Sequence, residues 1–338
     1  MHNSKNIFES NKKNDTSQTI YYHYTSLDAL YAIISNRSVR MTNMNFTNDR
    51  LELSYKVSEF YKDLKHLYEK EKSIEVKKCL RLYIDSFEKD FETFKYLFQK
   101  RSDTYALCLS EKKDNLTHWD RYADGCKGVC IGFNVKVFNY YSKKMKNEVI
   151  GNSLVSYGKI LYDDKSRRNE LLDKILNYHK ILIIEKIKSN FNVEEYIMNN
   201  GIFMLYTIFV SMKNIVKNKS FIDEDEVRVY HDKETLEYFN KVLNVIKDDN
   251  NEFNWDVIKY NTKKMISEYN LELENFYVSK YGIRSFINLS LEMLWDGNII
   301  TEIVLGPLCI QKYKELRKFL DNNGLEKVKI SKSKVPFR

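Results

Sequence analysis

The sequence predicts an α+β fold, and three features of its pattern lead to that class. Short strand-like runs occur along the whole 338-residue chain, without a regular alternation of strand and helix. Longer stretches with apolar residues at helical spacing separate these runs. Only 2 Pro and 10 Gly are present, which argues against repeats and linker-rich organisation. With 43% hydrophobic residues, including 19 Phe and 25 Tyr, the chain has enough apolar surface for a well-buried core.

The N-terminal elements follow from local signals. Residues 1–19 are polar and are expected to form a disordered tail before a single α+β domain over residues 20–338. A strand at 20–24 leads into a helix at 27–35, which Thr25 and Asp28 can begin as a capping box. The spacing of Asp49 and Glu52 repeats that signal at the start of a long helix.

The remaining elements are expected from periodicity. Large helical insertions are predicted at about 50–100 and 170–217. The predicted strands lie at 38–42, 104–110, 129–133, 154–162, 221–230, 299–305 and 327–331, with one or two more within 276–290. The predicted helices lie at 27–35, 50–67, 73–100, 234–248 and 311–322, with a short one after Asn115 and a long one within the second insertion.

Composition limits the class of protein. The net charge of +8 is spread along the chain, which indicates a lysine-rich solvated surface and leaves nucleic-acid binding as an open alternative. The five cysteines are odd in number and no secretory signal is visible, so a cytoplasmic location with free thiols is expected. Cys126 and Cys130 with His118 lack a second ligand pair, so no metal site is expected. The longest apolar run, 201–212, is too short for a bilayer, which predicts a soluble protein.

The run Tyr21 to Thr25 carries the first candidate site residue. In a strand, Tyr21, His23 and Thr25 share one face, and the tyrosines between them share the other. A neutral imidazole can donate to, or accept from, a ribose hydroxyl or a phosphate oxygen. The alternative is a half-buried His23 that is satisfied by the backbone.

Two further polar clusters have structural explanations of their own. Helix capping accounts for Asp49 and Glu52, which leaves only Asn48 for a role in binding. Trp119 and Tyr122 lie one helical turn apart, and they either pack in the core or stack on a flat heterocycle.

An acidic run provides the candidate catalytic groups. Glu224 and Glu226 at positions i and i+2 of a strand would share a face, about 7 Å apart. Such carboxylates raise each other's pKa unless a cation offsets them, and Arg228 can be that cation. The run is either an exposed edge or a pair of acids facing a sugar, where one acid stabilises positive charge at the anomeric carbon.

Several motifs resemble one bacterial family of unknown function, family 2971. Those that carry the resemblance are His23-Tyr24-Thr25-Ser26, Asn48-Asp49-x-x-Glu52, Ser110-Glu111, Trp119-x-x-Tyr122, Gly128 to Phe133, Glu224 to Arg228, Ile303 to Pro307 and Ser331-Lys332-Ser333. The resemblance runs over about residues 20–335. The opening His-Tyr-Thr and the acidic strand are also similar to the His-Tyr-Glu class of ADP-ribosyltransferases.

The second resemblance implies a split β-sheet core that binds NAD as substrate. His23 would hold the adenosine ribose, with Tyr24 on the same strand and Thr25 on the nicotinamide side. Glu226 or Glu224 would be the catalytic acid, and Tyr122 or Trp119 would stack on nicotinamide. Asn48 and Arg228 complete the residues expected to bind NAD, although Asn48 has no counterpart in the transferases.

The sequence therefore supports three hypotheses. The first is an enzyme that transfers ADP-ribose from NAD to a protein or nucleic-acid acceptor, or that hydrolyses NAD, as a toxin or phage-defence protein. The second is a non-catalytic module in which the same cleft recognises a nucleotide or a phage component and signals through the helical insertions, whose lysine-rich helices favour a contact surface. The third is a nuclease, for which Glu224 and Glu226 lack the further acidic or lysine partners of a Mg²⁺ site. The oligomeric state is not encoded in any pattern of the sequence.

Overall fold

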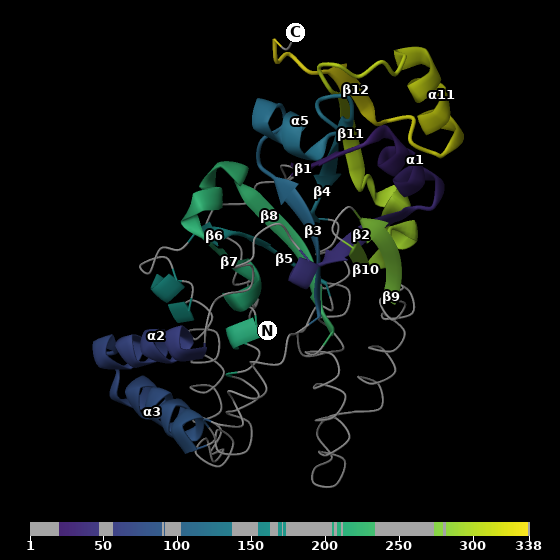
Figure 1. Ribbon diagram of the computed structural model, residues 1–338. Coiled ribbons are helices and arrows are strands. Elements are labelled where there is room, and N and C mark those ends of the chain that lie inside the picture. Colours follow the sequence, from purple (N-terminus) through teal and green to yellow (C-terminus); the bar gives the residue numbers. More distant parts are fainter. Residues whose placement is uncertain are drawn as a thin grey trace, which may run out of the picture. The chain divides into compact units, whose positions relative to one another are not determined.

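The computed structural model of the chain contains two compact units (Figure 1). It describes residues 20–46, 57–89, 91, 103–136, 155–162, 168–170, 172–173, 205, 208–210, 212–233, 274–279 and 282–336. Unit 1 includes Asn48–Asp103 and Ile160–Ile222, and unit 2 comprises Thr16–Thr47, Thr104–Lys159 and Asp223–Arg338. The α+β class is confirmed, because unit 2 is built on a large mixed sheet with helices on its faces.

Unit 2 contains a ten-stranded sheet with the order β12-β11-β4-β1-β3-β2-β10-β9, in which β8 adds to β3 and β5 adds to β8. All of its pairings are antiparallel except that of β11 with β12. Its strands are β1 Ile20–Thr25, β2 Ser38–Asn43, β3 Thr104–Ser110, β4 Val129–Asn134, β5 Ser156–Lys159, β8 Glu226–Asp232, β9 Glu274–Ser279, β10 Gly282–Ser290, β11 Ile300–Leu305 and β12 Lys329–Lys332.

The sheet forks at β3. One edge of β3 pairs with β8 along its whole length, from Thr104 to Ser110. The opposite edge is shared: β1 pairs at Ser110, and β2 pairs at Ala106 and Tyr105. The carbonyl of Cys108 lies between these two pairings, at the point where β1 and β2 diverge.

Alternation along the strands separates two apolar layers. The larger cluster includes Leu109 of β3, Val227 of β8 and Ile131 of β4, and it is covered by α1 (Leu27–Ser35) and α11 (Tyr313–Asn322). The smaller cluster on the opposite face joins Tyr24 and Cys130 to Trp119 of α5 (Leu116–Tyr122). Figure 1 shows α5 on one side of β1 and β4, with α1 and α11 on the other.

Unit 1 is built around a helical hairpin. Helices α2 (Val57–Lys70) and α3 (Ile74–Lys89) pack through aromatic rings, with Phe60 against Phe87 and Phe209. A parallel pair, β6 (Leu161–Tyr162) and β7 (Val216–Lys217), also belongs to this unit. The predicted helices at 50–67 and 73–100 are confirmed where the structure describes them, although α2 ends at Lys70 and not at Leu67. Residues 50–56, 90 and 92–100 of these predictions lie outside the described residues.

Two local predictions are wrong. The cap of α1 is Ser26, whose Oγ accepts a hydrogen bond from the Ala29 amide at 3.2 Å, and not Thr25, which is the last residue of β1. The predicted strand at 221–230 begins as a 3₁₀-helix, η2 (Lys219–Glu224), and becomes a strand only at Glu226. The predicted cap of α5 is confirmed, because the Asn115 side chain accepts from the His118 amide.

Short 3₁₀-helices follow two of the strands. They are η1 (Met44–Phe46) and η4 (Glu292–Gly297). The predicted tail at 1–19, the helix at 234–248 and most of the second insertion lie outside the described residues. The prediction of a single domain stays a prediction.

Candidate functional site

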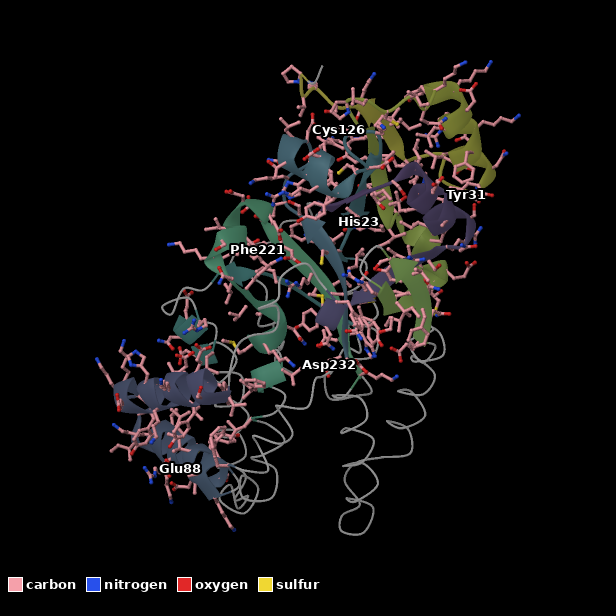
Figure 2. All side chains as sticks on the ribbon, in the orientation of Figure 1. His23, Tyr31, Glu88, Cys126, Phe221 and Asp232 are labelled. Carbon is pink, nitrogen blue, oxygen red and sulfur yellow. The ribbon has the colours of Figure 1, made fainter. Side chains whose placement is uncertain are left out.

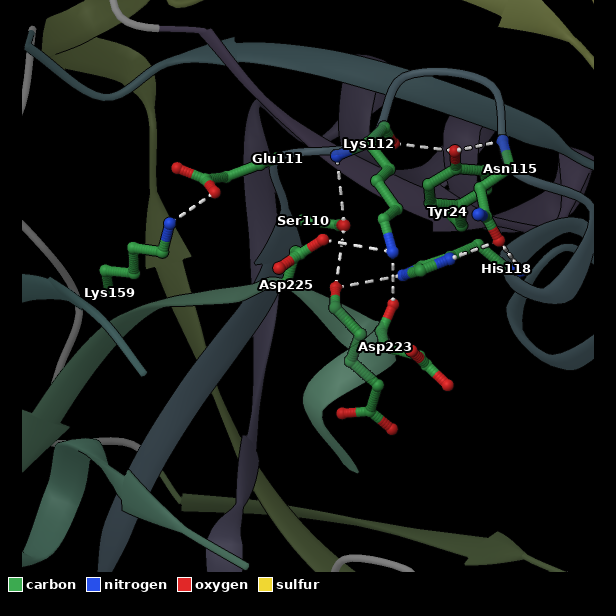
Figure 3. A network of polar contacts seen from close by, with 10 residues as sticks. Tyr24, Ser110, Glu111, Lys112, Asn115, His118, Lys159, Asp223 and Asp225 are labelled. Atoms are coloured by element: carbon green, nitrogen blue, oxygen red, sulfur yellow. Dashed lines mark hydrogen bonds and ion pairs between the residues drawn. The ribbon is translucent and has the colours of Figure 1, made fainter. Parts of the chain in front are cut away.

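The end of β3 carries polar side chains on both faces of the sheet. Ser110 and Lys112 lie on the face of Tyr24 and Trp119, whereas Glu111 lies on the face of His23. In Figure 3 the Glu111 and Lys112 side chains leave the backbone in different directions. We call the two groups the His23 cluster (Tyr21, His23, Glu111, Tyr157, Lys159) and the Glu224 cluster (Tyr24, Ser110, Lys112, Asn115, His118, Tyr122, Glu224).

His23 lies at the fork of the sheet, in the middle of the strand layer of unit 2 (Figure 2). Its Nδ1 is 3.0 Å from the carbonyl oxygen of Cys108. Because a carbonyl oxygen only accepts, Nδ1 must carry the hydrogen. Burial lowers the pKa of His23, and the bond to Cys108 offsets this only in part, so the ring is neutral at pH 7.

The other ring nitrogen of His23 has no hydrogen-bond partner among the described residues. In a neutral ring with hydrogen on Nδ1, Nε2 has a lone pair and accepts hydrogen bonds. Within the described residues, the contacts of His23 are the bond to Cys108 and an edge-to-face contact with Phe133, whose ring centroid is 6.4 Å away. The half-buried ring is therefore held in place at one nitrogen and presents an acceptor at the other.

Charged and phenolic groups lie near His23 on the same face. Tyr21, two residues before His23, has its pKa raised by burial first and then by the nearby Glu111 and Tyr157. The carboxylate of Glu111 forms an ion pair with Lys159 of β5, at 2.5 Å. Both of these side chains are substantially exposed, so the ion pair itself contributes little to stability.

The opposite face holds a tightly connected network (Figure 3). The Tyr24 hydroxyl donates to the Lys112 carbonyl at 2.7 Å and accepts from the Asn115 amide at 3.1 Å. The Glu224 carbonyl accepts from Ser110 Oγ at 2.8 Å and lies 3.1 Å from His118 Nε2. These bonds hold the turn before β8 against the end of β3.

Lysine and aspartate complete this turn. The Lys112 ammonium donates to the Asp223 carbonyl at 2.8 Å and lies 3.0 Å from the Asp225 carboxylate. Asp225 has a positive φ of 41°, which directs the chain from η2 into β8. His118 is buried, and burial lowers its pKa more than the contact with the Glu224 carbonyl raises it. The polar groups of this network therefore bind one another and hold the backbone of residues 223–225 in place.

Glu226 and Arg228 form a buried ion pair. Arg228 Nε donates to Glu226 Oε1 at 2.7 Å, and its Nη2 donates to Oε2 at 3.2 Å. Only 3% of Glu226 and 1% of Arg228 is exposed. Arg228 is thus the cation that the sequence predicted for this acid, but the pair lies inside the protein and not at an edge.

The predicted pairing of two acids on one strand face is wrong. Glu224 is the last residue of η2, and the left-handed Asp225 separates it from Glu226 on β8. The Glu224 carboxylate instead accepts a hydrogen bond from the Tyr122 hydroxyl, at 2.7 Å. The structure therefore brings Glu224 together with Tyr122, while Glu226 is paired with Arg228.

The predicted NAD-binding residues are divided between the two faces. His23 and the buried Thr25 lie on one face, and Tyr24, Trp119 and Tyr122 lie on the other. Trp119 is fully buried, with its ring 4.9 Å from that of Tyr24 and its Nε1 donating to Asp114. Trp119 is thus a core residue with no ring face for a ligand. Asn48 lies outside the described residues.

The family comparison covers a central part of the chain. Residues 118–229 match a family model. Its description is "Protein of unknown function (DUF2971)". The matched range begins at His118 and includes Gly128, Glu224 and Arg228, which supports the resemblance to family 2971 there. No curated protein and no solved structure matches the chain, so the likeness to ADP-ribosyltransferases has no support from these comparisons.

Two charged groups on the face of His23, the acid Glu111 and the cation Lys159, were not among the residues predicted from the sequence. Glu111 follows β3 directly, and its separation of two residues from Leu109 indicates that it shares the face of Leu109. Lys159 could not be placed from the sequence, because its strand reaches the site only through the pairing of β5 with β8. Within the described ranges, no three His, Cys, Asp or Glu side chains converge as a metal site would require. The described helices include none that is long and apolar enough to cross a bilayer.

Proposed function

We propose that the protein binds NAD, or a nucleotide of the same kind, at the His23 cluster and cleaves the nicotinamide–ribose bond there. The observation that carries the proposal is the fixed, neutral imidazole of His23, whose Nε2 accepts where a ribose hydroxyl can donate. His23 and Lys159 lie on the same face, three inter-strand steps or about 14 Å apart, with the buried Leu109 and Val227 between them. A nucleotide bound at both residues would therefore lie along the end of these strands, where the exposed Glu111 follows β3.

The two charged groups of the cluster each have a chemical task in this proposal. Lys159 pairs with the pyrophosphate, which releases Glu111 from its ion pair. The Glu111 carboxylate then stabilises the positive charge that develops at the anomeric carbon of the ribose. The C–N bond breaks with its electrons on nicotinamide, and water or an acceptor adds to the carbon and loses a proton. Water makes the protein an NAD hydrolase, and a macromolecular acceptor makes it an ADP-ribosyltransferase.

Glu111 replaces Glu226 as the acid in this proposal. Glu226 is buried on the opposite face and both of its oxygens accept from Arg228, so it cannot reach a ribose held by His23. Consumption of NAD at this cluster would fit a toxin or a phage-defence protein, because loss of NAD stops growth of the cell that contains the enzyme.

The second candidate is a nucleotide-sensing module without catalysis. The Glu111–Lys159 ion pair favours this alternative, since a carboxylate held by a cation is a weaker partner for an oxocarbenium ion. In that case NAD or another nucleotide binds beside His23, and no bond is broken.

Two measurements on three purified proteins separate these possibilities. NAD binding is measured by calorimetry, and nicotinamide release by chromatography, for the wild type, Glu111→Gln and Glu224→Gln. Glu224 is the matched control, because it is an acid at the end of the same region but on the opposite face. We expect Glu111→Gln to bind NAD and lose turnover by at least about 100-fold, with Glu224→Gln unchanged.

Other outcomes lead to different conclusions. Loss of turnover in Glu224→Gln alone would move the site to the Tyr122–Glu224 pair. Binding without nicotinamide release in the wild type would favour the sensing module. Absence of NAD binding at about millimolar concentration would reject the proposed function.

A further inference from the structure

The helical hairpin of unit 1 carries a concave surface that the proposed function does not use. This surface encloses about 390 Å³ along α3 and the end of α2. We call it the hairpin groove, and it is lined by Tyr68, Ile74, Lys77, Lys78, Arg81 and Leu82. Ile74 is 82% exposed, so a partner can contact this end of the groove from solvent.

The groove follows a second stripe of α3. The first stripe packs into the core of unit 1 through Val76, Leu80, Tyr83, Ile84 and Phe87. The second stripe has the spacing i, i+3, i+4, i+7, i+8 and contains Ile74, Lys77, Lys78, Arg81 and Leu82. At these five positions it combines aliphatic and cationic side chains, and one turn further along the stripe lies Asp85.

Leu82 and Tyr68 form the floor of the groove, since both are partly buried against the core cluster of unit 1. Three cations surround this floor, and the lining residues include no carboxylate. Arg81 forms an exposed ion pair with Asp85 at 2.8 Å, one turn further along α3. The groove is therefore apolar at its base and positive at its rim.

The ring of Tyr68 is already covered. The Lys77 ammonium lies over it, 5.1 Å from the ring centroid. A nucleobase could not stack on Tyr68 without displacing this cation. The aliphatic side chains of the exposed Ile74 and the partly buried Leu82 offer no favourable contact to a phosphodiester backbone. These features favour a peptide over a nucleic acid.

We propose that the hairpin groove binds an acidic amphipathic helix of a protein partner. Apolar side chains of that helix would cover Ile74 and Leu82, and its Asp or Glu side chains would pair with Lys77, Lys78 and Arg81. A helix in a groove between two helices needs apolar anchors on one stripe, with complementary charge at its edges. The proposal is independent of NAD binding, because the groove lies within unit 1 and the His23 cluster within unit 2.

The probe for this proposal is a designed helix, used with the full chain. It is a fluorescein-labelled 18-residue peptide with Leu at helical spacing and Glu at the other positions. A second peptide carries Lys in place of every Glu. We expect the acidic peptide to bind, as measured by fluorescence anisotropy, and the basic peptide not to bind. The affinity should fall as salt is raised from low to physiological concentration, because the rim charges are exposed.

Substitutions then locate the binding surface. Lys77→Glu combined with Lys78→Glu should weaken binding at least tenfold, and Ile74→Asp should do the same without removing a cation. Lys89→Glu on the same helix is the matched control, since Lys89 is exposed but does not line the groove. Circular dichroism and thermal melting show whether each variant is folded.

Three results would overturn the proposal. One is absence of acidic-peptide binding at about millimolar concentration. Another is an equal loss of binding in the Lys89→Glu control, which would indicate a general charge effect. The third is binding of a single-stranded 12-nucleotide RNA with the same dependence on Lys77, Lys78 and Ile74, which would identify a nucleic-acid surface instead.

Discussion

His23 and Glu226 lie on opposite faces of one sheet, although their strands are both neighbours of β3. Tyr22 of β1 is directly opposite Ser110, and Ser110 is directly opposite Glu226, so Tyr22 and Glu226 share a face. His23 is the next residue after Tyr22 and therefore points the other way. A ligand that is bound at His23 cannot reach Glu226. In the proposed function, the carboxylate that acts on the ligand therefore has to come from the His23 face, where Glu111 lies.

The buried ion pair predicts a stability role for Glu226. Glu226→Gln should lower the free energy of unfolding by about 3 kcal/mol, because it leaves the Arg228 guanidinium buried with a neutral partner. The double change Glu226→Leu with Arg228→Met should recover part of this loss, since it removes both buried charges. Urea denaturation of the three proteins measures the difference. If Glu226→Gln were as stable as the wild type while its NAD turnover were lost, a catalytic role for Glu226 would be restored.

Two glycines close in sequence should respond differently to alanine. A Cβ at Gly128 would lie 2.1 Å from the Thr25 carbonyl oxygen and 2.9 Å from that of Ala123. Both atoms belong to the backbone and cannot move aside, so Gly128→Ala should cost about 3 kcal/mol of stability or prevent folding. Gly125→Ala meets no atom within 4 Å and should cost only about 1 kcal/mol, for its φ of +56°. Soluble yield and thermal melting test this contrast, which equal stabilities of the two variants would contradict.

Asp114 should make stability depend on acid pH. Burial raises the pKa of its carboxyl, but hydrogen bonds from Ser333, the Lys334 amide and Trp119 outweigh burial, and the net pKa lies below the usual value. A carboxyl whose folded pKa is depressed stabilises the fold above its unfolded pKa and loses that contribution as pH falls through the folded pKa.

The matching variant is Asp114→Asn. At pH 7 it should be less stable than the wild type by about 1–2 kcal/mol, since it loses charge-assisted hydrogen bonds. The difference should shrink as the pH falls below about 4, the usual pKa of an unfolded Asp, towards the lower pKa of the folded carboxyl. Chemical denaturation at a series of pH values gives both curves. A difference that stays constant down to about pH 2 would show that the carboxylate charge is not involved.

Much of the fold of unit 2 was predictable from local signals. The strand at 104–110 and the helix cap at Asn115 are confirmed, because strand alternation and capping depend on residues near one another in sequence. The strand at 221–230 was placed too early. Phe221 and Ile222 are common in strands, but regular alternation begins only at Glu226. The left-handed Asp225 before it is stabilised by contacts with Glu111 and Lys112, which are distant in sequence.

The candidate site was less predictable for the same reason. Alternation correctly placed His23 and Tyr24 on different faces, yet the sequence cannot show which face a distant acid shares. That depends on the order β1-β3-β8-β5, where a shift of one residue in register exchanges the two faces. Glu111 and Lys159 thus meet on the His23 face through three strand pairings that no local motif encodes.

His23 itself provides the most direct test of the proposed site. Removing its imidazole breaks one hydrogen bond to the Cys108 carbonyl, so His23→Ala should cost no more than about 1 kcal/mol and leave the melting temperature nearly unchanged. The same change removes the Nε2 acceptor, and NAD binding should fall at least tenfold. His66→Ala in unit 1 serves as a control that removes a histidine from outside the cluster. Calorimetric titration with NAD, alongside thermal melting, measures both effects. Should His23→Ala unfold the protein, or should it bind NAD as tightly as the wild type, His23 would be a core residue and the site would lie elsewhere.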